Sequence, residues 1–237
     1  MNTLELAPPE GAVRLLRNNL NNWTTREGQP AGWRLEDGVA HVVPGAGDIM
    51  TDERFTDFYL HLEFRCPDMP EATGQAKGNS GVFLQGRYEI QVLDSSGFAI
   101  PGKGDCGAIY NQYAPLVNAC SAPLMWQAYD VFFRAPREEE HVGPRITVLH
   151  NGQLIHNGIE LPGVTGAALD ELQERVERGA LHHTDGVRAL EHEDFAEGVE
   201  HRVRGGEGRL LVELLRDLST VHSPQSTVSP QSTVRSP

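Results

Sequence analysis

The amino-acid sequence predicts an all-β protein, an antiparallel sandwich of two sheets followed by a C-terminal part of different character. Fifteen of the sixteen Phe, Trp and Tyr residues lie between Trp23 and Phe133, and such residues favour pleated sheets. Several segments of the same region alternate apolar and polar residues with a period of two. Turn signals recur about every ten residues without any alternation of strand and helix, which is typical of a sandwich.

Two segments, Phe58–Arg65 and Arg87–Asp94, show this alternation most clearly. We expect one face of each strand to meet the core and the other to carry polar groups. The core-facing residues are Phe58, Leu60, Leu62 and Phe64 in the first strand, and Tyr88, Ile90 and Val92 in the second. The polar face of the first strand carries Tyr59, His61, Glu63 and Arg65, and that of the second carries Arg87, Glu89 and Gln91.

Shorter strands are expected before, between and after these two. Asn151-Gly152 joins the last pair, and because both residues tolerate a positive φ, this dipeptide predicts a type I′ hairpin turn. In chain order the shorter strands are Trp33–Leu35, Val39–Val43, Gly81–Gln85, Tyr129–Arg134, Ile146–His150 and Gln153–Ile155.

The composition changes beyond about Gly163. Leu169, Leu172 and Val176 fall on one side of a short amphipathic helix that should end near Gly179. The hexapeptide of residues 223–228 is repeated at once in residues 229–234, and this polar, Pro-rich repeat predicts disorder. We therefore divide the chain into a lead-in (1–20), the sandwich (21–163), an atypical, partly helical segment (164–218) and a disordered low-complexity tail (219–237).

The charge balance restricts the class of partner. With 20 Lys and Arg against 33 Asp and Glu, a net charge of −13 argues against nucleic-acid and anionic-membrane partners. The chain has no apolar run near the roughly 18 residues of a spanning helix. Its start has no signal-peptide pattern, which predicts a cytoplasmic location by default; a processed start would allow a periplasmic or secreted one. Three cysteines without a CxxC pair predict a reduced compartment and neither a disulfide scaffold nor a structural zinc site.

The polar faces of the two clearest strands are candidates for binding a sugar. Sugar hydroxyls need hydrogen bonds from planar polar groups, and aromatic rings cover their C–H faces. Glu89 and Gln91 project from one strand, with Asp94 at its end, and His61 and Glu63 project from the other. The alternative is that these residues form ordinary solvated outer faces.

Three further residues are candidates beside these strands. Asn79 opens the strand before Glu89 in a Gly-rich stretch that either admits a ligand to the backbone or only makes turns. Trp126 and Gln127 precede a later apolar strand, where Trp126 would serve either as a platform for a sugar ring or as part of the core.

The segment Gly78–Asp94, GNSGVFLQGRYEIQVLD, resembles the signature of the 3-keto-disaccharide hydrolase domain family, formerly called DUF1080. The resemblance covers residues 23–163. Further pieces follow in family order: Gly47–Ile49, Leu60–Arg65, Cys106–Tyr110, Pro115–Asn118, Trp126–Asp130, Phe133–Pro136 and Thr147–Gly152.

The resemblance implies a concanavalin A-like, jelly-roll-like sandwich that acts on glycosides, some of them oxidised to a ketone at C3. Such a ketone acidifies the C2–H, so a base can remove this proton, the glycosidic oxygen can leave and water can add back. A hydrogen-bond donor or a cation, for which a divalent metal ion is one candidate, would hold the enolate oxygen. Conventional chemistry with two carboxylates is the competing scheme.

The resemblance also implies roles for single residues. Glu89 or His61 would be the catalytic base. The residues around the substrate would be Gln91, Asp94, Asn79, Glu63, Tyr110, Trp126 and Gln127.

Family members close the sandwich with two more strands, which residues 164–218 do not match. We therefore expect these strands to be lost or replaced. The sequence predicts a carbohydrate-active hydrolase or lyase that cleaves glycosidic bonds by general acid–base chemistry. The alternative is a carbohydrate-binding module without activity, or an inactive remnant of the family.

Overall fold

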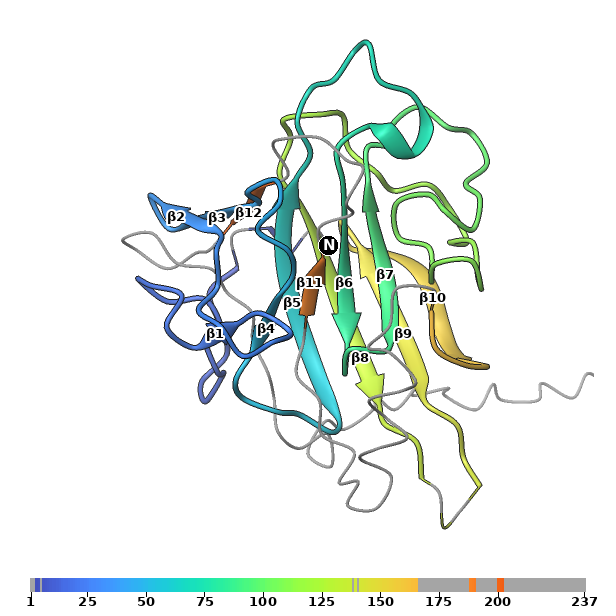
Figure 1. Ribbon diagram of the computed structural model, residues 1–237. Coiled ribbons are helices and arrows are strands. Elements are labelled where there is room, and N and C mark those ends of the chain that lie inside the picture. Colours follow the sequence, from blue (N-terminus) through green and yellow to red (C-terminus); the bar gives the residue numbers. More distant parts are fainter. Residues whose placement is uncertain are drawn as a thin grey trace, which may run out of the picture.

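The computed structural model of the chain describes residues 3–4, 6–137, 139, 141–165, 188–190 and 200–202, and it forms two antiparallel sheets (Figure 1). The first sheet contains, in spatial order, β1 (Trp23–Thr24), β4 (Ile49–Thr51), β11 (Arg188–Leu190), β6 (Asn79–Leu84) and β7 (Tyr88–Leu93). The second contains β10 (Gln153–Glu160), β9 (Arg145–His150), β8 (Gln127–Arg134), β5 (Phe58–Arg65), β12 (Glu200–Arg202), β3 (Val39–His41) and β2 (Arg34–Glu36). The predicted fold class, an antiparallel β-sandwich, is confirmed.

The core lies between the two sheets and is built from the predicted apolar faces. The seven core-facing residues expected in β5 and β7 are all buried there. Phe133 of β8 stacks on Phe58 of the same sheet, with ring centroids 5.1 Å apart, and contacts Tyr88 of the other sheet at 5.8 Å. Because both apolar faces turn inward, the polar faces of β5 and β7 must point away from each other.

The predicted turn between β9 and β10 is also confirmed. Asn151 and Gly152 have φ angles of 50° and 76°, as a type I′ turn requires. β10 continues past its predicted end to Glu160, and its pairing with β9 shifts register on both sides of His156. These irregularities explain why alternation is weak in the second half of β10.

β11 and β12 correct the expectation that the closing strands are lost or replaced. β11 pairs with β4 on one side and with β6 on the other, while β12 lies between β3 and β5. Both strands are therefore internal to a sheet. Each has three residues, too few for a period of two to be recognised in the sequence.

The two ends of the chain differ in how far the structure describes them. Leu15 and Leu16 of the predicted lead-in are buried in the core. The helix expected near residues 169–179 and the tail 219–237 lie outside the described residues. Within the described part, no helix is long and apolar enough to cross a membrane.

Replacing Leu62 by Ala tests the orientation of β5. Leu62 is 7% exposed, and truncating a buried Leu costs about 2–5 kcal/mol, so we expect that loss in the free energy of unfolding measured by urea titration. Leu154→Ala, at a residue of β10 that is 41% exposed, is the control and should cost much less. A loss below about 0.5 kcal/mol for Leu62→Ala would mean that the two faces of β5 are reversed.

Candidate functional site

The outer face of the five-stranded sheet holds three of the predicted site residues, because β6 and β7 turn their other sides to the core. Asn79 extends from β6, and Glu89 and Gln91 extend from β7. Each of the three is at most 3% exposed. A carboxylate and amides buried together need hydrogen-bond partners, which makes them candidates for recognising a hydroxyl-rich ligand. We call the following group the Glu89 face: Gln75, Asn79, Gly81, Glu89 and Gln91.

The position of the Glu89 side chain depends on the absence of a side chain at Gly81. A Cβ at position 81 would lie 3.0 Å from both Cγ and Cδ of Glu89, and closer still to Oε1. Glycine inside a strand often marks a place where another group must approach the backbone closely. Glu89 thus reaches across β6, away from its own strand.

Gln75, which the sequence analysis did not single out, connects the amides of this face. It lies in η1 (Gly74–Ala76), between β5 and β6. Its Oε1 accepts a hydrogen bond from Asn79 Nδ2 at 3.1 Å, and its Nε2 donates to the carbonyl oxygen of Gly104 at 2.8 Å. Gln75 is half-buried, so this network reaches the surface there.

The amide of Gln91 can link this network to Glu89. In one orientation its nitrogen donates to Gln75 Oε1 at 3.0 Å. With nitrogen and oxygen exchanged, which suits its neighbours better, the nitrogen donates to Ser80 O at 2.9 Å and to Glu89 Oε1 at 3.2 Å. The Gln91 amide therefore lies within hydrogen-bond distance of both Gln75 and Glu89.

Asn79 has spare capacity to accept a hydrogen bond. Its Nδ2 donates to both oxygens of Gln75, but its Oδ1 is buried and has no hydrogen-bond partner among the described residues. Leaving a buried acceptor unsatisfied costs about 1–3 kcal/mol. A hydroxyl group of a ligand on the Glu89 face would supply the missing donor.

Tyr110 lies at the rim of the Glu89 face. Its segment runs along the free edge of β7, where Gly107 N donates to Gln91 O at 2.9 Å and Tyr110 N donates to Glu89 O at 3.1 Å. A Cβ at Gly104 would lie 3.3 Å from Gln75 Nε2 and 3.9 Å from Cε2 of the Tyr110 ring, so both groups are close to Gly104. The structure thus brings the backbone of residues 107–110 next to that of Glu89 and Gln91.

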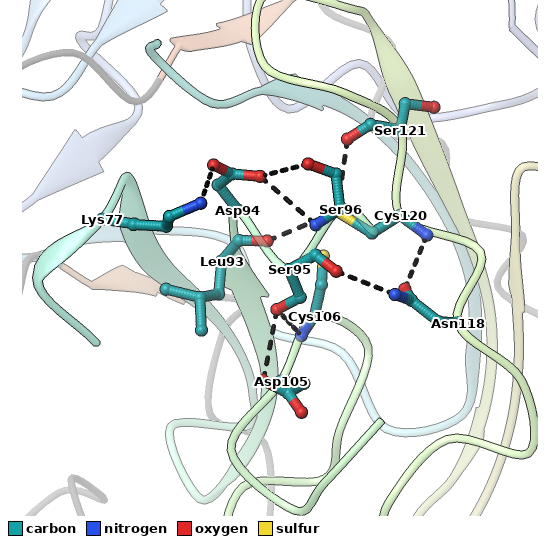
Figure 2. A network of polar contacts seen from close by, with 10 residues as sticks. All are labelled: Lys77, Leu93, Asp94, Ser95, Ser96, Asp105, Cys106, Asn118, Cys120 and Ser121. Atoms are coloured by element: carbon teal, nitrogen blue, oxygen red, sulfur yellow. Dashed lines mark hydrogen bonds and ion pairs between the residues drawn. The ribbon is translucent and has the colours of Figure 1, made fainter. Parts of the chain in front are cut away.

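Asp94 ends β7 in an ion pair rather than as a free acid. Its Oδ2 lies 2.9 Å from Lys77 Nζ, and its Oδ1 accepts from Ser96 Oγ at 2.8 Å, as Figure 2 shows. Burial alone would raise the pKa of Asp94, but the hydrogen bonds from Lys77 and Ser96 outweigh it and lower this pKa. Asp94 is therefore a carboxylate that fixes the end of β7.

His61 and Glu63 do not share this face, which is a correction. They extend from β5 of the other sheet, away from the core, and so point out of the opposite side of the sandwich from Glu89. Packed sheets lie about 10 Å apart, so a single sugar cannot contact His61 and Glu89 at once. The expectation that both line one face is wrong because alternation in one strand does not show which sheet the strand joins.

His61 instead belongs to a compact polar cluster with Asp130 of β8. Its Nδ1 lies 2.7 Å from Asp130 Oδ1, which also accepts from Tyr59 Oη at 2.6 Å, and its Nε2 lies 3.8 Å from Glu63 Oε1. Thr3 Oγ1 donates to Asp130 Oδ2 at 2.5 Å, which ties the N-terminal segment to this face.

These contacts determine the charges in the cluster. Burial favours the neutral ring of His61, but hydrogen bonds to Asp130 and Glu63 outweigh it and raise the pKa of His61 to about 9. Burial likewise opposes ionisation of Asp130, yet hydrogen bonds from His61, Thr3 and Tyr59 lower its pKa. His61 is therefore a cation held between two carboxyl groups.

The structure also separates Trp126 and Gln127 from the Glu89 face. The Trp126 ring packs under the guanidinium group of Arg65, 4.9 Å from its carbon to the ring centroid. Gln127 is fully buried in the interior, where its Oε1 lies 2.8 Å from His150 Nε2. Burial lowers the pKa of His150 to about 3, so this ring is neutral. Gln127 supports the core rather than a surface site.

No metal centre is evident among the described residues. No three or more of their His, Cys, Asp and Glu side chains are grouped as a metal ion requires.

Comparison with known proteins identifies the class of this protein. The chain belongs to the family of 3-keto-alpha-glucoside-1,2-lyase-like domains, whose model matches residues 12–204. This match extends past the sandwich boundary predicted at residue 163 and includes β11 and β12. No curated protein matches the chain.

Three crystal structures of proposed glycosyl hydrolases from Parabacteroides distasonis ATCC 8503 are similar to this chain. The first is 30% identical, covers 87% of this chain and 84% of its own, and superposes with a TM-score of 0.72. The other two are 17% and 19% identical, with TM-scores of 0.53 and 0.52. Both cover 81% of this chain, and 90% and 99% of their own chains. These two support the fold alone.

The cluster around His61 makes stability depend on pH. The pKa of His61 is raised from 6.5 to about 9 on folding, so protonated His61 stabilises the folded state. This stabilisation is complete below about pH 6.5 and is lost as the pH rises through 9. We expect wild type to exceed His61→Gln in free energy of unfolding at pH 6, and this margin to shrink by up to about 3 kcal/mol at pH 10. Urea titrations of both proteins measure it. A margin that stays constant with pH would refute the charged state of His61.

Proposed function

We propose that the protein cleaves glycosides that carry a ketone at C3, with Glu89 as the general base. The observation that carries this proposal is the buried Glu89 carboxylate, which lies against Gly81 and 3.2 Å from the Gln91 amide, on the sheet face that also carries Asn79. Membership of a family of 3-keto-alpha-glucoside-1,2-lyase-like domains supports the same substrate class.

In the proposed reaction, Glu89 removes the proton from C2, which the neighbouring ketone has acidified. The electron pair moves into an enolate and then forms a C1–C2 double bond as the C1–O bond breaks. The departing oxygen takes a proton, and the protonated carboxyl of Glu89 can supply it. Addition of water across the double bond would complete a hydrolysis, whereas release before that step makes the enzyme a lyase.

The amides of the Glu89 face suit the binding part of this reaction. Asn79 Oδ1, buried and without a partner in the described part of the chain, would accept a bond from a sugar hydroxyl. The amide nitrogen of Gln91 can donate to an oxygen at this face, and the enolate oxygen is the one that gains charge. The partly exposed Tyr110 ring would cover a C–H face of the sugar.

The position of Asp94 favours one base over a pair of carboxylates. A conventional glycosidase needs an acid and a second carboxylate on either side of the scissile bond. Asp94 is engaged by Lys77 and Ser96, and its lowered pKa makes it a poor proton donor at neutral pH. Glu89 can perform the elimination alone, because one carboxyl group can take the C2 proton and return it to the leaving oxygen.

Glu89→Gln tests the role of the carboxyl group. The amide keeps the shape of Glu89 but cannot accept the C2 proton, so we expect turnover of a 3-keto-glycoside to fall about 10²- to 10⁴-fold with little change in binding. Glu160→Gln, at an exposed residue of β10, is the matched control and should leave turnover unchanged.

The other outcomes separate the alternatives. Wild type that binds the sugar but shows no turnover would support a carbohydrate-binding module. Full activity of Glu89→Gln would refute the role of Glu89. If His61→Gln abolishes turnover instead, the site lies on the opposite side of the sandwich.

Gly81→Ala tests whether the position of Glu89 matters. The added methyl group must displace the carboxylate, and a displacement of about 1 Å can cost on the order of 10²-fold in rate. We expect kcat to fall by that order while KM changes little. Gly143→Ala is the matched control, because a Cβ there would likewise meet a glutamate carboxyl group, Glu160 Oε1 at 2.7 Å, and Glu160 is an exposed residue of β10 in the other sheet. Equal turnover in both variants would contradict the assignment.

A further inference from the structure

The proposed function leaves the three thiols of the chain without a role. Cys66, directly after β5, and Cys106 are at most 2% exposed, whereas Cys120 is half-buried. All three are free thiols. Cys106 and Cys120 belong to the long segment that connects β7 to β8, the same segment that places Tyr110 beside the Glu89 face.

Cys106 and Cys120 are held next to each other by a shared anchor, Ser95. Cys106 N donates to Ser95 Oγ at 3.0 Å, and Asn118 Nδ2 donates to Ser95 O at 2.8 Å. Asn118 Oδ1 in turn accepts from Cys120 N at 3.1 Å. Figure 2 shows the two side chains beside Ser95.

The two thiol groups are close enough that each shifts the pKa of the other. Cys120 Sγ also lies 3.5 Å from the carbonyl oxygen of Leu93, the last residue of β7. On the other side, Cys106 Sγ lies 3.1 Å from Tyr129 Oη. The pair therefore lies at the junction of β7, β8 and the connecting segment.

The environments of the two sulfurs differ in a way that suits a stepwise oxidation. The hydrogen bond from Cys106 lowers the pKa of the Cys120 thiol, although burial opposes it. Burial raises the pKa of the Cys106 thiol. The more exposed sulfur is thus the better nucleophile, and the buried one is next to it as a resolving group.

We propose that Cys106 and Cys120 form a redox-active pair that closes to a disulfide and ties the segment around Tyr110 to the end of β7. With hydrogen peroxide as oxidant, the Cys120 thiolate attacks one peroxide oxygen and becomes a sulfenic acid, releasing hydroxide. The Cys106 sulfur then attacks the Cys120 sulfur and displaces water. In total, two thiols and one peroxide give one disulfide and two waters.

The disulfide would act on the rim of the Glu89 face through the backbone. Residues 107–110 bond along the edge of β7 at Gln91 and Glu89, and they directly follow Cys106. A covalent link to Cys120 closes a short loop around this segment and reduces its freedom in the unfolded chain. Oxidation should therefore raise the melting temperature by several degrees.

The experiment counts thiols in the purified full-length protein before and after a stoichiometric amount of hydrogen peroxide at pH 7. The reduced protein should show three free thiols and the oxidised one a single thiol, and dithiothreitol should restore the other two. Peptide mass spectrometry without reduction should find Cys106 linked to Cys120. This readout does not depend on any enzymatic activity, so it stands apart from the proposed function.

Variants distinguish the pair from the third thiol. Cys66→Ala is the matched control and should still lose both remaining thiols to the same link. Cys106→Ala and Cys120→Ala should each form no link within the chain. A link that involves Cys66, links only between chains, or wild type that keeps three thiols would each overturn the proposal.

Discussion

The structure depends on one constraint, the alternation of side chains along a strand whose apolar side must be buried. Phe58, Leu60, Leu62 and Phe64 on β5 meet Tyr88, Ile90 and Val92 on β7 across the interior. Because these apolar sides face each other, the polar sides of β5 and β7 point in opposite directions. The same constraint that builds the core therefore separates the chemistry of the molecule into two outer faces, one around Glu89 and one around His61.

This explains how far the sequence could predict the fold and the site. The two long strands, their core residues and the type I′ turn were predictable because each depends on a local pattern. The partner of each strand depends on contacts distant in sequence, so nothing local in β5 or β7 assigned His61 and Glu89 to different sheets. Asp130 was missed for the same reason: its polar position in β8 was visible, but its pairing opposite His61 was not. Gln75 was missed because a short turn carries no periodic signal.

The Glu89 face and the His61 cluster also differ in how their charges are balanced. Asp130 is surrounded by donors from three residues, and His61 is held between two carboxyl groups. Such a closed set of charges stabilises one arrangement and offers little to a ligand. On the Glu89 face the described side chains of Gln75, Asn79 and Gln91 are neutral amides, and Asn79 has an unused acceptor. Neutral groups with spare hydrogen bonds are better suited to exchange partners with sugar hydroxyls.

The central positions of β11 and β12 have a consequence for how the chain folds. Among the described strands, β4 and β6 are joined only through β11, and β3 and β5 only through β12, so each sheet needs residues from near position 190 or 200 to become continuous. As the ribosome makes the chain, the other described strands emerge first, and the strand edges on both sides of each gap stay unpaired until β11 and β12 are made. Such contacts between distant residues slow folding, and unpaired edges favour association with other chains. Completion of both sheets is therefore a late event, possible only after almost the whole domain has been synthesised.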